Sequence, residues 1–108
     1  MVIVLFHIKV RDDANLAAYE RTSERMIEIV SAMPGFLGLE GYAGADGSEL
    51  AVARFESDEA VQAWKAQPEH VRTQERGRAE FFAAYDITVA DVIRHYDWSA
   101  AAAATLAS

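Results

Sequence analysis

The stretch that decides the fold is WKAQPEHVRTQERGRAEFFAAY, residues 64–85. Proline fits the first turn of a helix, so one helix is expected to end at Gln67 and a second to start at Pro68. At about 100° per residue, one side of the second helix mixes polar and aromatic side chains: His70, Gln74, Arg78, Phe81 and Phe82. Because buried polar groups need partners, this mixture predicts a helix that lines a ligand cavity.

A purely structural interpretation of this helix also stands. Glu75 and Arg78 are three residues apart and can pair with each other, while Gln74 can lie along apolar surface and reach water with its tip. Gly77 costs a helix interior roughly 1 kcal/mol against alanine. Such a glycine indicates close approach of another backbone or of a ligand, and close helix packing is the simpler reason.

Composition limits the classes of protein to consider. The chain has 108 residues, enough for one domain, and its net charge of −7 argues against binding to nucleic acid or to an anionic membrane. It has no cysteine, which excludes disulfides and cysteine-held metal sites and is compatible with a cytoplasmic protein. No segment resembles a signal peptide or reaches the ~18 apolar residues of a membrane helix.

The rest of the chain alternates between strand and helix patterns. Strands are expected at 2–10, 36–42 and 49–56, and from 85 or 86 to 96. A helix between the first two strands is capped by Asp12 or Asp13, has Asn15 at its start as a further capping residue, and is ended by Pro34-Gly35. Ser57 caps the next helix. The order β-α-β-β-α-β is the split βαβ pattern of a ferredoxin-like α+β domain.

The first strand is apolar on both faces, with Phe6 and Ile8 on one face and Ile3 and Leu5 on the other. The expected helices cover only one face, so the other predicts a homodimer through the sheet. His7 shares this second face, where a satisfied interface residue and a ligand-binding residue are both open interpretations. The alanine-rich tail, residues 98–108, is expected to be a helical stub, a docked arm or a disordered end.

Several short motifs together resemble a known family over residues 1–97. They are Phe55-Glu56-Ser57-Asp58, Trp64, Pro68-Glu69-His70, Gln74, Gly77-Arg78, Phe81-Phe82, Tyr85, and Val89, Val92, Arg94 and Tyr96. The chain is similar to antibiotic biosynthesis monooxygenase (ABM) domains of the dimeric α+β barrel superfamily. This resemblance implies a dimer with a small pocket between each sheet and its helices.

The resemblance also implies particular site residues. Some relatives are cofactor-independent monooxygenases that oxidise aromatic polyketides, with a tryptophan and, six residues later, a polar ring residue near the substrate. Trp64 and His70 match that spacing, although the asparagine that accompanies this tryptophan is Ala60 here. Other relatives degrade haem with a histidine ten residues after a tryptophan; that position is Gln74, which disfavours haem.

The leading hypothesis is a monooxygenase that needs no bound cofactor or metal and acts on a small aromatic or polyketide-like substrate. In it, His70 acts as the base and Arg78 stabilises the enolate oxygen. The expected substrate-binding residues are His7, Trp64, Gln74, Phe81 and Phe82. The alternatives are a non-catalytic dimer that binds a small ligand, a haem-binding or haem-degrading monooxygenase, and a structural dimer without a ligand.

Overall fold

The computed structural model describes residues 1–102. Its elements, in chain order, are β1 (Val2–Val10), α1 (Leu16–Ser31), β2 (Phe36–Ala43), β3 (Glu49–Phe55), α2 (Asp58–Ala66), α3 (Pro68–Arg76), the π-helical turn η1 (Gly77–Phe81) and β4 (Phe82–Asp91). The second helical unit is split at Gln67, as the proline predicts. The order of elements confirms the α+β, ferredoxin-like prediction.

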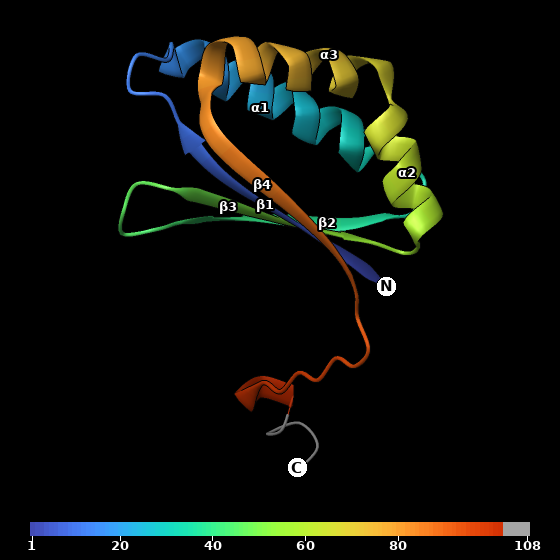
Figure 1. Ribbon diagram of the computed structural model, residues 1–108. Helices are drawn as coiled ribbons and strands as arrows, with labels where there is room; N and C mark the ends of the chain where they lie inside the picture. Colours follow the sequence, from blue (N-terminus) through green and yellow to red (C-terminus); the bar gives the residue numbers. More distant parts are fainter. Residues whose placement is uncertain (103–108) are drawn as a thin grey trace.

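The four strands form one antiparallel sheet in the order β2-β3-β1-β4. Figure 1 shows α1 and α3 side by side over one face of this sheet. In the central strand, Phe6 lies between Ala51 of β3 and Ile87 of β4. Because side chains alternate between faces, Phe6 and Ile8 point towards the helices, and Leu5 and His7 point to the uncovered face.

The buried core is concentrated at one end of the sheet. Val2, Val30, Phe55 and Val61 form its centre, and Trp64 and other partly buried side chains pack against it. Phe36 and Phe55 meet edge to face there, with ring centroids 5.6 Å apart. Val30, Phe36 and Trp64 of this cluster also line the space between the helices and the sheet.

The helix caps confirm two predictions and correct a third. The Ser57 side chain accepts a hydrogen bond from the Ala60 amide at 3.2 Å, so Ser57 caps α2 as predicted. For α1, the prediction of Asp12 or Asp13 as the cap was wrong, whereas the prediction of Asn15 as a capping residue is confirmed. Asn15 is the cap, because it is extended directly before Leu16 and accepts from the Ala18 amide at 3.0 Å.

The boundary between the last helix and the last strand also differs from the prediction. We expected helix up to about residue 84 and strand from 85 or 86 to 96, whereas β4 runs from Phe82 to Asp91. The turn η1 brings the chain out of the helix early, with the Phe82 amide donating to the Gly77 carbonyl five residues back. A π-turn breaks the 100° spacing, so the predicted wheel does not hold beyond Arg76.

Beyond β4, the chain extends away from the sheet as an arm (Figure 1). Three large side chains on it, Ile93, Tyr96 and Trp98, are 77–90 % exposed. A short helix begins at Ala100, and the rest of the predicted tail, residues 103–108, lies outside the described part. The division into a domain and a tail stays a prediction.

Within residues 1–102, no helix is long and apolar enough to cross a membrane.

Candidate functional site

A cavity of about 740 Å³ lies between the sheet and the helices. Its floor comes from β1, β2 and β3, and its walls come from α1, the end of α2, α3 and η1. Five of the seven predicted site residues line it: Trp64, His70, Gln74, Phe81 and Phe82. The cavity is thus built around the segment of residues 64–85.

The floor of the cavity is made of unusually small residues. Gly41 and Ala43 of β2 and Ala51 and Ala53 of β3 line it, and Gly41 lies directly opposite Ala51 in the sheet. A Cβ added at Gly41 would meet no atom within 4 Å, so it would enter open space. These positions were not predicted from the sequence. Their signal is small residues at alternate positions of two paired strands, where a covered sheet normally carries large apolar side chains.

Trp64 and His70 form one unit on the cavity wall. Their rings are stacked, with centroids 3.8 Å apart and an interplanar angle of 8°. His70 Nδ1 lies 2.8 Å from the Trp64 carbonyl oxygen, and the Gln67 side chain accepts from the His70 amide at 2.8 Å. Pro68 starts α3 between them, so the six-residue spacing places both rings at the junction of the two helices.

The hydrogen bond of His70 fixes its tautomer. A carbonyl oxygen only accepts, so Nδ1 carries the proton and Nε2 holds the lone pair in the neutral ring. Within residues 1–102, no hydrogen bond engages Nε2. Burial lowers the pKa of His70, and the hydrogen bond to the Trp64 carbonyl raises it by a smaller amount. The net effect is a pKa below 6.5. His70 is therefore neutral near pH 7 and can accept a proton at Nε2.

Aromatic rings close the other end of the cavity. Tyr19 meets Phe81 and Phe82 edge to face, with centroids 5.6 and 6.3 Å apart, and Phe6 meets Phe82 at 5.8 Å. The Phe82 ring lies against Gly77, where an added Cβ would overlap it. The close approach predicted at Gly77 is therefore made by the side chain of Phe82, the first residue of β4. Such a wall suits flat, apolar ligands.

Tyr19 also carries a polar contact that was not predicted. Its hydroxyl donates to Glu49 Oε2 at 2.8 Å, and both residues line the cavity. Burial and the neighbouring Glu49 carboxylate both raise the pKa of Tyr19, burial being the larger cause. The two residues are 30 positions apart, and only the packing of α1 over the start of β3 brings them together.

His7 and Arg78 do not line the cavity. His7 lies on the uncovered face of the sheet, with Nδ1 3.5 Å from the Asp86 carboxylate. Arg78 Nη1 donates to the Tyr85 hydroxyl at 3.1 Å, in an exposed position. The structure thus separates these two residues from the other five, and their roles at a substrate stay predictions.

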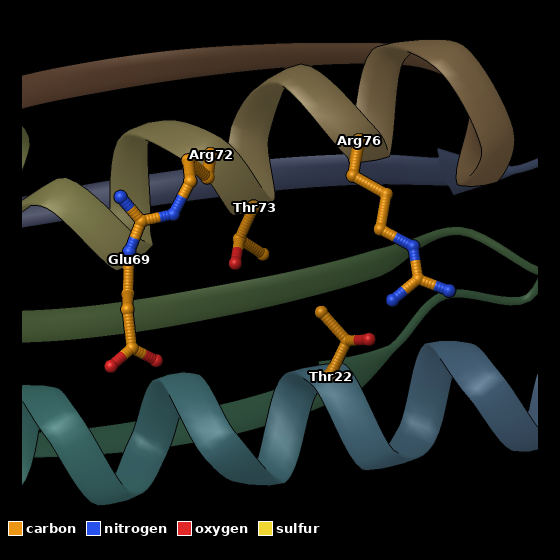
Figure 2. A pocket seen from close by; sticks show the side chains of 5 residues that line it. All are labelled: Thr22, Glu69, Arg72, Thr73 and Arg76. Carbon is orange, nitrogen blue, oxygen red and sulfur yellow. The ribbon is translucent and has the colours of Figure 1, made fainter.

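A shallow pocket lies on the outer side of the seam between α1 and α3 (Figure 2). It has a volume of about 290 Å³ and is lined by Thr22, Glu69, Arg72, Thr73 and Arg76. Thr22 and Thr73 point towards each other across the seam, and both also line the large cavity. Arg25 and Glu69 bridge the same two helices with bonds of 3.0 and 3.1 Å. The two spaces are therefore neighbours across one pair of threonines.

In the described part of the chain, no group of three or more His, Asp or Glu side chains is placed to hold a metal ion. The polar side chains of the cavity are instead spread along its length, between the His70 end and the Glu49 end. This arrangement offers one base and a few hydrogen-bonding groups around an apolar centre.

Comparison with known proteins agrees with this architecture. The family model for antibiotic biosynthesis monooxygenase matches residues 1–76. The uncharacterized protein YqjZ of Bacillus subtilis is 36% identical over 80 residues, which cover 74% of this chain and 70% of that protein.

Two solved structures show the same fold. Rv0793 from Mycobacterium tuberculosis has a TM-score of 0.77 and 21% identity, covering 89% of this chain and 98% of that one. The N63A mutant of SnoaB, described as a cofactor-independent oxygenase from Streptomyces nogalater, has a TM-score of 0.73 and 19% identity, covering 87% of this chain and 94% of that one. At these identities the likeness concerns the fold.

Proposed function

The chain belongs to the antibiotic biosynthesis monooxygenase family, and from this premise we propose that it is a cofactor-independent monooxygenase of a small aromatic, polyketide-like substrate. The observation that carries the proposal is His70, a neutral histidine with a free Nε2 on the wall of an aromatic cavity. The description of SnoaB as a cofactor-independent oxygenase supports the reaction type.

The proposed reaction starts with a proton transfer. His70 Nε2 removes a proton from an acidic C–H that lies between aromatic rings, and Trp64 and Phe82 hold the ring system. The carbanion gives one electron to O₂, and the two radicals combine into a carbon-bound peroxide. His70 returns its proton to the peroxide, and loss of the remaining C–H hydrogen as a proton then breaks the O–O bond and leaves a ketone. The departing oxygen leaves as water with these two protons. The substrate supplies all four electrons, so CH₂ and O₂ become C=O and H₂O.

Oxygen uptake with anthrone tests this proposal. Wild-type protein is expected to consume one O₂ per anthrone and form anthraquinone. His70→Gln should lower the rate by about 10²–10⁴-fold, the usual contribution of a general base. His95→Gln is the matched control, because His95 lies outside the cavity beside Asp97.

The other outcomes of this experiment separate the alternatives. Saturable anthrone binding without O₂ uptake overturns the enzymatic proposal in favour of a non-catalytic binding protein. Unchanged turnover in His70→Gln removes the proposed base. A Soret shift with added haemin points instead to a haem-binding protein.

We also propose that two copies associate through the uncovered face of the sheet. Ile3 and Leu5 of β1 and Val52 of β3 form an apolar centre there, and the helices lie on the other side (Figure 1). Leu5→Lys should convert a dimer into a monomer in light scattering, whereas Leu16→Lys on α1 should not. A wild-type monomer contradicts this arrangement. The cysteine-free sequence keeps the cytoplasm as the predicted compartment.

A further inference from the structure

We propose that Glu49, oriented by Tyr19, is the polar anchor of the cavity and selects ligands that donate a hydroxyl over ligands that carry a carboxylate. The proposal rests on the proposed function in one respect, because it assumes that this cavity holds the substrate. It concerns binding preference, which is measured without turnover.

The charges around the cavity support this selection. Among residues 1–102, Glu49 presents a carboxylate to it, Glu40 borders it with a side chain on the uncovered face of the sheet, and no lysine or arginine lines it. Glu40 is paired with Arg54 at 2.9 Å and also accepts from the Tyr42 hydroxyl. Glu49 has no ion pair among residues 1–102. An anionic ligand therefore meets an uncompensated carboxylate and finds no cation on the lining.

The hydrogen bond from Tyr19 leaves Glu49 ready to accept more. Burial and Glu49 together raise the pKa of Tyr19, so its hydroxyl stays protonated and donates to Oε2. An ionised carboxylate has about four acceptor sites, and Tyr19 occupies one of them. Tyr19 is itself held by edge-to-face contacts with Phe81 and Phe82, so the carboxylate has a defined direction.

The position of Glu49 complements that of His70. Glu49 is opposite Ile8 and Ala43 in the sheet, while Trp64 packs near Val2 at the other end. From Val2 to Ile8 the strand spans about 20 Å. A flat ligand whose reacting carbon is near His70 thus extends along the aromatic wall, and a hydroxyl at its far end approaches Glu49. Because Glu49 is exposed, this end of the cavity is open to water and to larger ring substituents.

A matched set of three probes tests the selection in wild-type protein. The probes are 2-naphthol, 2-methoxynaphthalene and 2-naphthoate, which share one ring system and differ in a donor, a blocked donor and a negative charge. Calorimetry near pH 7 should show 2-naphthol binding about tenfold more tightly than the ether, as for a hydrogen bond to a charged group, and naphthoate binding more weakly than either. Naphthoate binding as tightly as 2-naphthol overturns the proposal.

Two variants assign the preference to the residues. Glu49→Gln removes the charge and should reduce the discrimination against naphthoate about tenfold, whereas Tyr19→Phe should reduce the preference for 2-naphthol over its ether. Glu20→Gln is the control, because it removes the same charge from an exposed position on α1 outside the cavity. An unchanged ratio between the probes in Glu49→Gln contradicts the anchor.

The design also keeps the two proposals separate. Ratios between probes in one protein sample are insensitive to partial loss of folded protein, because both affinities are affected equally. Selective binding of 2-naphthol without oxygen uptake contradicts the proposed monooxygenase activity and supports the proposed role of Glu49. Oxygen uptake with equal binding of the three probes supports the monooxygenase activity and contradicts the proposed role of Glu49.

Discussion

The imidazole of His70 lies flat on the indole of Trp64, and its Nδ1 binds the carbonyl oxygen of the same tryptophan at 2.8 Å. One residue thus fixes both the plane and the tautomer of the other. The stacking also removes water from one face of the imidazole, which disfavours its charged form. This relationship gives the first prediction about activity.

Activity should fall on the acid side with a midpoint below pH 6.5. His70 acts in its neutral form, and burial lowers its pKa from 6.5, so protonation of the base sets in only below that value. The measurement is kcat/KM for anthrone oxidation against pH, with the His70 ring nitrogens followed by NMR. A midpoint above 6.5, or a proton on Nε2 instead of Nδ1, contradicts the assignment.

The lowered pKa of His70 also makes the fold less stable as pH falls below 6.5, because the histidine of the unfolded chain takes up the proton first.

Filling the floor of the cavity should weaken ligand binding without harming the fold. In Gly41→Val the new side chain enters open space above Ala51, and valine suits a strand better than glycine does. We expect binding of 2-naphthol to weaken at least tenfold while the melting temperature stays the same or rises. Gly38→Val is the control, because Gly38 also has free space at its Cβ but does not line the cavity. Equal binding in both variants would place the ligand elsewhere.

Gly77→Ala should destabilise the protein through Phe82. The added Cβ overlaps the Phe82 ring, and overpacking of this kind costs typically 1–3 kcal/mol. Urea denaturation of the variant should show this loss. In Gly77→Ala/Phe82→Leu the extra cost should largely disappear, because the smaller side chain leaves room for the methyl group. Additive losses in the double variant would mean that helix geometry, and not the ring, requires the glycine.

The fold was predicted well because the residues that start and end its helices act on their immediate neighbours in the sequence. Pro68 and Ser57 act within a few residues, and the structure has both where they were expected. The site was predicted in part, because Trp64 and His70 meet across a single helix junction. Arg78 was grouped with them by a helical wheel that the π-turn at Gly77 invalidates.

The missed parts of the site depend on distant segments. Glu49 was assigned only to a strand, because nothing near it in the sequence shows that Tyr19 lies above it. The small-residue floor requires the register of β2 against β3, which places Gly41 opposite Ala51. Such pairings follow from the packed sheet, and a pattern read along one segment does not contain them.

The cap of α1 links local structure to the site, and it gives the last prediction. Asn15→Ala removes the acceptor of the Ala18 amide and should cost about 1 kcal/mol, or roughly 4–8 °C in melting temperature. Asp12→Ala and Asp13→Ala should cost much less, because neither side chain caps the helix.

Tyr19 is in the first turn that the cap secures, and its amide donates to the Asn15 carbonyl at 2.9 Å. Fraying of this turn should therefore also weaken binding of 2-naphthol in Asn15→Ala. A stable variant with unchanged affinity would show that the contacts of Tyr19 with Phe81 and Phe82 hold the turn without its cap.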